Sequence, residues 1–343
     1  MTFGKTTVAP GETKTINLEV ARLYTHDEMY MTAHVIYGKQ PGPHLFLSAA
    51  MHGDEINGLE IIRRVLKRVD PQTLNGAVIA VPVVNSFGLI FRSRYLPDRR
   101  DLNRCFPGSR KGSLASQMAR LFMDEIVSNA THGIDFHTGA LHRSNLPQIR
   151  ANLDDSETEK LAKAFGTPVL INANLRDGSL RQAVSEQGIP MLLFEGGEAL
   201  RFDEFAIRSG VSGTLSLMEK LNMIPEEEGK PETPRPYVAN SSYWVRAPRA
   251  GILRTTSLLG KWMAEGERLG AISEPLGEHD EDVLTPQGGI VIGQTNLPLV
   301  NRGDGMFHLA SFDKPRIVQR HLKTYTSALE EYDDYAEDWE GPE

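Results

Sequence analysis

The stretch HLFLSAAMHGDEINGLEIIRRVLKRV (44–69), followed by NGAVIAVPVVN (75–85), decides the fold class of this chain. It holds two short, continuously apolar runs at 45–51 and 77–85, of the kind expected for strands buried on both faces. Between them apolar residues recur every three or four positions, which predicts a helix over 55–69. Strand, helix and strand in this order form the crossover unit of a mostly parallel sheet.

The same pattern continues as far as residue 224. We expect further strands at 133–137, 167–172 and 191–195, and further helices at 177–187 and 204–222. The sequence therefore predicts an α/β domain over 1–224, with a mixed, mostly parallel sheet and flanking helices.

A break follows at PEEEGKPETPRP (225–236), where four prolines, a glycine and charged residues replace the apolar periodicity. We interpret 225–237 as a linker between domains. Beyond it, glycine turns separate short apolar runs, which predicts a small all-β domain over 238–325. The remaining residues, 326–343, are interpreted as an acidic tail that is solvated or docks onto a neighbouring subunit of a homo-oligomer.

Charge and composition narrow the class of protein. The net charge of the 343 residues is -8, and 330–343 alone carries eight acids without a lysine or arginine, so the rest sums to zero. The chain has no basic stripe that predicts nucleic-acid binding. No apolar run approaches the roughly 18 residues of a membrane span, and the N-terminus lacks a secretory h-region. Cys105 is the single cysteine, so we expect a reducing, cytoplasmic location.

Polar residues with metal-binding chemistry follow two of the expected strands. His52 and Glu55 stand three apart where a strand ends and a helix begins, so both can face one ligand. His137, in DFHTG (135–139), ends another expected strand. Two imidazoles and a carboxylate leave one position open on a zinc ion, as in catalytic sites. The alternative for His52 and Glu55 is a capping histidine and a surface glutamate.

Two further segments carry candidate catalytic or binding residues. Glu195 emerges from the apolar run MLLF into a glycine pair, either as a general base near a metal or as one half of a strand-end salt bridge. The segment RSRYLPDRRDLNR (92–104) has five arginines and no secondary-structure period. Guanidinium groups bind carboxylates and stabilise oxyanions, and a solvated basic loop is the alternative.

Four motifs in order resemble one known family of hydrolases. His52-x-x-Glu55, DLNR (101–104), DFHTG (135–139) and EGG (195–197) are similar to the succinylglutamate desuccinylase/aspartoacylase family of zinc carboxypeptidase-like enzymes. The resemblance covers roughly 40–310 and implies a zinc-exopeptidase-like fold and cleavage of an amide bond in a small N-acyl amino acid or N-acyl amine.

The resemblance also implies a role for each motif. It makes His52, Glu55 and His137 the ligands of one zinc ion per chain, and Glu195 the catalytic carboxylate. It further makes Asn103 and Arg104 the binders of a substrate carboxylate. An arginine near the scissile carbonyl is also implied, and Arg94 fits that position better than Arg92.

Other functions remain alternatives at this point. The closest is a metallocarboxypeptidase that acts on short peptides, and a metal-binding protein without turnover is another. The segments VRAPRAGIL (245–253) and AEGERLGAISEPLG (264–277) are similar to barrel-sandwich-like biotinyl carrier modules. The position of the modified lysine there reads EPLG (274–277), so a lid or an oligomerisation element is the better interpretation.

Overall fold

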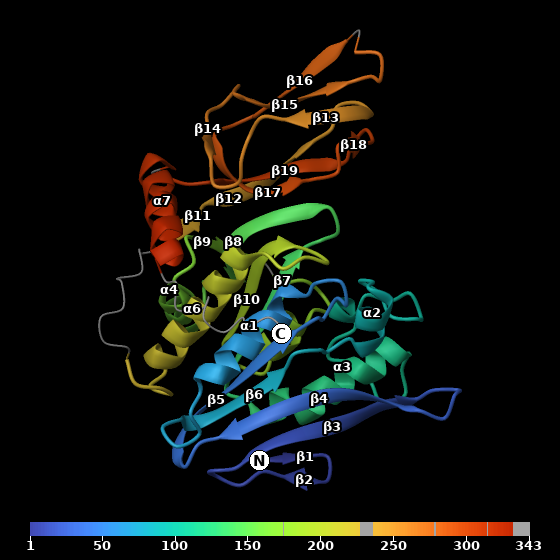
Figure 1. Cartoon of the computed structure of the whole chain (residues 1–343), viewed down its shortest axis with the longest axis vertical. Helices are drawn as coiled ribbons and strands as arrows, with labels where there is room; N and C mark the ends of the chain where they lie inside the picture. The colour runs from blue at the N-terminus through green and yellow to red at the C-terminus, as the bar shows by residue number, and fades with distance from the viewer. Residues whose placement is uncertain (174, 227–235, 278, 314, 332–343) are drawn as a thin grey trace, which may run out of the picture.

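A large mixed sheet organises the computed structural model, which describes residues 1–173, 175–226, 236–277, 279–313 and 315–331 (Figure 1). Among these residues the sheet has 13 strands. In its centre β6, β5, β7 and β10 pair in parallel, β8 pairs antiparallel with β10, and β9 and β11 continue in parallel from β8. These strands are β5 (Gln40–Ala49), β6 (Asn75–Val81), β7 (His132–Gly139), β8 (Arg143–Ala151), β9 (Val169–Asn172), β10 (Met191–Glu198) and β11 (Tyr237–Ala239).

The N-terminal residues extend the sheet on one side. The strand β4 (Glu28–Tyr37) pairs antiparallel with β6, and β3 (Thr13–Arg22) pairs antiparallel with β4. A separate two-stranded sheet of β1 (Thr2–Phe3) and β2 (Thr6–Thr7) lies beside them.

Helices cover both faces of the sheet, as its apolar strands require. On one face, α1 (Asn57–Arg68), α4 (Ser156–Phe165) and α6 (Glu204–Lys220) share a core with the strands. On the other face lie α2 (Ser86–Phe91), α3 (Leu114–Glu125), α5 (Leu180–Ser185) and the short helices η1 (Leu102–Arg104) and η2 (Val127–Asn129). The C-terminal helix α7 (Pro315–Glu331) packs on α6, where Tyr325 and Ser209 share a hydrogen bond of 2.6 Å.

The C-terminal strands form a sandwich that is continuous with the large sheet. One layer consists of β12 (Ser241–Arg246), β14 (Trp262–Met263), β17 (Gly289–Thr295) and β19 (Gly305–Ser311), which join the large sheet because β17 pairs with β8. The second layer is a sheet of β13 (Gly251–Thr255), β15 (Arg268–Ser273), β16 (Asp280–Leu284) and β18 (Leu299–Val300). Apolar residues of both layers share one core.

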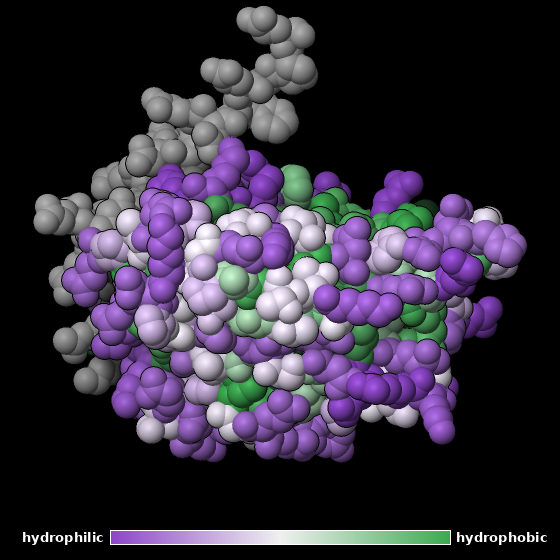
Figure 2. Space-filling model, turned by 90° about the horizontal axis from the view of Figure 1, so that it is seen from below, coloured by the Kyte–Doolittle hydropathy of each residue, from purple (hydrophilic) through white to green (hydrophobic). Residues whose placement is uncertain are grey.

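The face of the molecule seen in Figure 2 is mainly polar. Figure 2, seen from below Figure 1, shows a largely hydrophilic face on which the apolar residues gather in small, separate patches. No helix in the described ranges is both long and apolar enough to cross a membrane. The apolar side chains of the strands are instead buried between sheet and helices.

The structure confirms the fold class predicted from the sequence. The expected strands and helices all appear, with ends that differ by a few residues, as in the helix α1. Parallel pairing joins β6, β5, β7 and β10 in the centre and β8, β9 and β11 in a branch, and antiparallel pairs flank the centre on both sides. The expected linker falls between α6 and β11, and residues 227–235 of it lie outside the described residues. The end of the expected acidic tail, 332–343, lies outside them too.

Candidate active site

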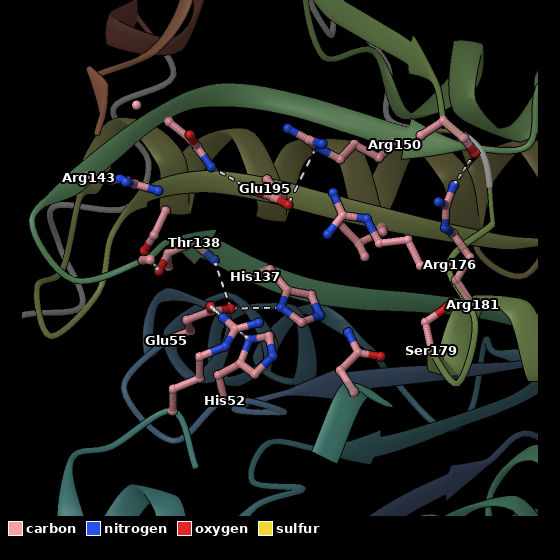
Figure 3. Close-up of a pocket in the computed structure, with 18 of the residues that line it drawn as sticks. His52, Glu55, His137, Thr138, Arg143, Arg150, Arg176, Ser179, Arg181 and Glu195 are labelled. Carbon is pink, nitrogen blue, oxygen red and sulfur yellow. Dashed lines mark hydrogen bonds and ion pairs between the residues drawn. The ribbon is translucent and has the colours of Figure 1, made fainter. Parts of the chain in front are cut away.

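Three side chains from two neighbouring strand ends meet at the carboxyl edge of the central strands. His52 and Glu55 lie in the turn between β5 and α1, and His137 lies in β7, the parallel neighbour of β5. Both imidazoles turn Nδ1 toward Glu55, at 2.7 Å from Oε1 for His52 and 2.7 Å from Oε2 for His137. The ligating atoms lie within 4.8 Å of one another, and all three side chains are buried (Figure 3). This donor set fits zinc and leaves one coordination position open.

A carboxylate holds the other ring nitrogen of each histidine. His52 Nε2 is 3.2 Å from Asp101 Oδ1, and His137 Nε2 is 2.7 Å from Asp135 Oδ2. Asp135 is itself fixed by Ser48, whose Oγ donates to Oδ1 at 2.8 Å. Such contacts set the tautomer and the ring orientation, so that Nδ1 remains available to a metal.

Charges at the triad compensate one another despite the burial. Burial lowers the pKa of His137, but Asp135 and Glu55 outweigh it and raise that pKa well above its usual value. Burial raises the pKa of Glu55, yet His52 and His137 hold it far below the usual range. Glu55 is therefore ionised in the folded protein, which is the state a metal ligand requires.

Arg94 is the arginine that the structure places against the triad. Its NH1 lies 3.2 Å from both His52 Nδ1 and Glu55 Oε1, and its NH2 donates to Asp101 Oδ2 at 2.9 Å. Burial lowers the pKa of Arg94, but Glu55 and Asp101 outweigh it and raise that pKa, so the guanidinium stays charged. Arg92, the rival candidate, is exposed at the end of α2 with a left-handed φ of 51° and does not line the cavity.

Glu195 reaches the same cavity from β10. It stands opposite His137 in the parallel register of β10 and β7, and its side chain is 20% exposed. Asn145 Nδ2 donates to its Oε2 at 2.5 Å, and Arg150 Nε lies 3.4 Å from its Oε1. Figure 3 shows Glu195 on a different strand from the triad, facing the space above it. Glu195 is not among the grouped metal-binding atoms of the triad, and its catalytic role stays a prediction.

The turn after Glu195 needs its glycines. Gly197 has a φ of 75°, a conformation that side chains other than glycine rarely adopt. A Cβ at this position would also meet the amide of Asn57, which donates to the carbonyl oxygen of Gly196 at 3.1 Å. The glycine pair therefore lets α1 pack against the strand end that carries Glu195.

Asn103 and Arg104 both line the cavity, but they differ in freedom. Asn103 is buried, and its Oδ1 accepts a hydrogen bond of 2.9 Å from the backbone nitrogen of Leu180. Its amide nitrogen is the group that can donate to a ligand. Arg104 is exposed and donates to the carbonyl oxygen of Asn103 at 2.5 Å. The substrate-binding role of this pair stays a prediction.

The cavity has a volume of about 540 Å³ and an excess of arginine. Besides Arg94 and Arg104, it is lined by Arg143, Arg150, Arg176, Arg181 and Arg246, whereas its lining carboxylates are Glu55 and Glu195. Burial, together with Arg150 and Arg176, lowers the pKa of Arg181 to about 10. The excess of guanidiniums over carboxylates indicates a site that favours an anionic ligand.

The C-terminal strands supply part of the cavity wall. Trp244 and Arg246 of β12 and Gly305 of β19 line it. The Trp244 ring stacks on His308 at a centroid distance of 4.7 Å, and the guanidinium of Arg143 lies 5.2 Å from the ring. The C-terminal strands therefore contribute side chains to the cavity, and their expected role as a lid or an oligomerisation element stays a prediction.

Sequence reasoning missed several of these residues. Asp101 belongs to the DLNR motif, but its contacts with His52 and Arg94 depend on how the loop folds. Arg150 gives a weak signal, because it ends the mostly apolar segment LPQI within β8. Arg176 and Arg181 come from one segment and Arg246 from another far along the chain, and none of them belongs to a motif.

Comparison with known proteins agrees with this geometry. Residues 41–221 match the model of the succinylglutamate desuccinylase/aspartoacylase catalytic domain, which is more than half of the chain. The chain belongs to this family. The match contains His52, Glu55, His137 and Glu195, and it ends just after α6. Deacylases of this family are hydrolases that act on amides, and this is the general class of the chain.

Relatives and solved structures extend the likeness into the C-terminal strands. This member of the succinylglutamate desuccinylase/aspartoacylase family is 26% identical to the N-alpha-acetyl-L-2,4-diaminobutyric acid deacetylase of Halomonas elongata, over 77% of this chain and 80% of that protein. A succinylglutamate desuccinylase/aspartoacylase from Rhodobacter sphaeroides shares the fold with a TM-score of 0.77 and 24% identity, over 88% of this chain and 95% of that one. The product-bound ectoine utilization protein EutE (DoeB) from Ruegeria pomeroyi does so with a TM-score of 0.78 and 22% identity, over 88% and 95%.

Proposed function

We propose that the chain is a zinc-dependent deacylase that hydrolyses the amide bond of a small N-acyl amino acid or a related N-acyl amine. One observation carries this proposal: the ligating atoms of His52, Glu55 and His137 lie within 4.8 Å of one another, beside Glu195 on the next strand. A zinc ion held by these three ligands would polarise the amide carbonyl and activate water at neutral pH. We also propose a cytoplasmic location, which the single cysteine of the sequence favours.

Three charged residues around the triad then have a part in the reaction. Glu195 takes a proton from the attacking water and passes it to the leaving nitrogen. Arg94 points its guanidinium at the triad, where the negative charge of the carbonyl oxygen develops. Asp101 holds Arg94 in that position through Nε and NH2, at 3.2 and 2.9 Å. Water addition to the amide carbon and cleavage of the C–N bond give a carboxylate and an amine.

The arginines of the cavity support an anionic substrate. Seven arginines and two carboxylates line the cavity, and one of these carboxylates, Glu55, is already paired with the two imidazoles. Arg104, with the amide nitrogen of Asn103, would bind the carboxylate next to the scissile amide. The remaining arginines favour a second anionic group on the substrate. An N-acetylated diaminobutyric acid, which the name of the Halomonas relative gives, has an amine instead of that second anion.

A substrate panel tests the class of reaction. The zinc-loaded protein is incubated with N-acetylated dicarboxylic, neutral and diamino acids and with short peptides, and free amines are quantified. We expect kcat/KM to be highest for the N-acetylated dicarboxylic acids, by a factor of about 10 or more, corresponding to one extra charged hydrogen bond. Preferred cleavage of peptides would instead identify a carboxypeptidase.

Two sets of variants test the assignment of residues. We expect about one zinc per chain in the wild type, and His52→Ala and His137→Ala should lose most of it. Glu195→Gln should keep the zinc and the fold but lose roughly 10² to 10⁴ in kcat, the range for a general acid–base group. Full zinc content in both histidine variants, or normal turnover in Glu195→Gln, would overturn the proposed function.

A further inference from the structure

Strand β8 carries an asparagine whose neighbours on both adjacent strands are glycines. Asn145 pairs with Gly197 of β10 on one side and with Gly293 of β17 on the other. The pairing of β8 with β10 changes register between Glu195 and Gly197, and such irregularities reorient side chains next to functional sites. Asn145 is 9% exposed and lines the cavity, so its amide is directed inward.

The amide of Asn145 fixes the carboxylate of Glu195. Its Nδ2 donates to Oε2 at 2.5 Å, while Arg150 attracts the other oxygen from 3.4 Å. Glu195 is 20% exposed and has three rotatable side-chain bonds, so burial alone does not select one orientation. Without the amide, the arginines of the cavity would compete for the carboxylate.

The C-terminal strands in turn leave room for this amide and bind the start of β8, the strand that carries it. A Cβ at Gly293 would lie 2.8 Å from Asn145 Oδ1 and 3.2 Å from His308 Cβ, so any side chain there would displace the amide. Just beyond β17, the backbone nitrogen of Asn296 donates to the carbonyl oxygen of His142 at 2.7 Å. Its Nδ2 donates to Ser144 Oγ at 2.6 Å.

We propose that Asn145 is a positioning residue for Glu195, and that the C-terminal β domain serves catalysis by holding Asn145 in place through Gly293 of β17. This inference rests on the proposed role of Glu195 as acid and base. It gives the C-terminal strands a function that differs from a lid, because the domain acts on the orientation of a catalytic side chain through a shared sheet.

The first test separates positioning from substrate binding. Asn145→Ala should lower kcat by about 10- to 100-fold, since a small misplacement of a reacting group costs that much, and KM should change less than about threefold because the substrate contacts remain. Zinc content and the unfolding midpoint should stay near those of the wild type. Asn240→Ala is the matched control, because it removes an amide–carboxylate hydrogen bond of 2.6 Å, to Asp313, away from the cavity.

A double-mutant cycle tests the role of β17. Gly293→Ala alone should lower kcat, but in the Asn145→Ala background, where no amide is left to displace, it should have little further effect. If Gly293→Ala does not fold, Asn296→Ala replaces it, because that change removes the side-chain hydrogen bond to Ser144 at the start of β8 without adding atoms. Additive losses in kcat, or a KM that rises as much as kcat falls, would overturn the inference.

The outcomes also separate this inference from the proposed function. Normal kcat in Asn145→Ala together with an inactive Glu195→Gln would overturn the positioning role alone. Normal kcat in Glu195→Gln would overturn the proposed function, on which the positioning role depends.

Discussion

Replacing Asp101 with asparagine should damage the site more than the same change at Asp135, although each carboxylate faces one histidine of the triad. Asp135 Oδ2 faces His137 Nε2, and its Oδ1 accepts from the hydroxyl of Ser48. An amide at 135 can keep its oxygen on His137 and turn its NH2 group to Ser48, because a hydroxyl can accept as well as donate. Asp135→Asn therefore loses the charge but keeps both hydrogen bonds.

Asp101 offers no such arrangement to an amide. Its Oδ1 faces His52 Nε2 at 3.2 Å and accepts from the backbone nitrogen of Asn103 at 2.9 Å. Its Oδ2 accepts from Arg94 Nε and NH2 at 3.2 and 2.9 Å. Arginine and backbone nitrogens only donate, and so does Nε2 when Nδ1 binds a metal. The NH2 group of Asp101→Asn must then point at a pair of donors.

The difference in magnitude follows from the bonds lost. Loss of charge behind a ligating histidine costs about 10-fold in metal affinity, which is about 1.4 kcal/mol. Asp101→Asn loses two hydrogen bonds to charged or polarised donors, each worth about 1.5–3 kcal/mol. Because the Asp101 side chain is 15% exposed, we take the lower end. The two lost hydrogen bonds together cost about 3 kcal/mol, which corresponds to a loss of roughly 100-fold. This loss is divided between zinc affinity, through His52, and kcat, through Arg94.

Chelator competition measures the zinc affinity of both variants, and kcat is measured at saturating zinc. Asp70→Asn, an exposed loop variant, is the control for general effects of removing a carboxylate. We expect Asp101→Asn to lower both quantities and Asp135→Asn to lower mainly zinc affinity. Equal effects in the two variants, or a larger effect in Asp135→Asn, would refute the argument from donor count.

Three further predictions follow from single contacts. Arg104→Ala should nearly erase the preference of the wild type for a substrate carboxylate over the corresponding carboxamide. Arg104→Lys should already raise KM, since an ammonium group cannot bind both carboxylate oxygens. A wild type that hydrolyses the acid and the carboxamide equally well would contradict this. Burial lowers the pKa of His308 to about 3 in the folded protein. The stability contributed by its neutral ring is therefore complete above the unfolded-state pKa of about 6.5, and it falls as the pH drops toward the folded-state pKa. At pH 5 the loss in the free energy of unfolding is about 2 kcal/mol. His308→Gln should flatten the acid side of Tm against pH, and parallel curves would contradict this. Gly58→Ala should lower the free energy of unfolding, measured in urea, by roughly 1–3 kcal/mol, although alanine has the higher helix propensity. The reason is that the new Cβ would lie 2.5 and 2.6 Å from the Cβ atoms of Ala49 and Phe136. A variant more stable than the wild type would contradict this.

Local sequence signals were sufficient for the central strands and the triad. The apolar runs and the helical period over 55–69 belong to one continuous stretch, so neighbouring residues alone determine the strand, the turn and the helix. The carboxyl ends of parallel strands meet at one edge, so His52 and His137 could be expected to converge before any contact was known. The family resemblance favours Arg94 over Arg92, and the structure places Arg94 beside Glu55.

Contacts between distant segments could not be read in the same way. The antiparallel pairing of β17 with β8 joins residues about 150 positions apart, and an apolar strand does not specify its partner. The same applies to the arginines of the cavity, because a single arginine in a strand or loop is ordinarily a surface residue. The structure is needed to show that Arg150, Arg181 and Arg246 line the same cavity.

The pairing of β17 with β8 also changes the meaning of the predicted domain boundary. A proline-rich segment between two folded parts ordinarily separates units that move independently. Here Leu146 of β8 and Val169 of β9 share a core with Ile290 and Ile292 of β17, and backbone hydrogen bonds continue across the junction. Moving the C-terminal strands would expose this core and break the ladder next to Asn145. The predicted linker therefore joins the two parts along the chain, while the shared sheet fixes their relative position and the geometry of the site.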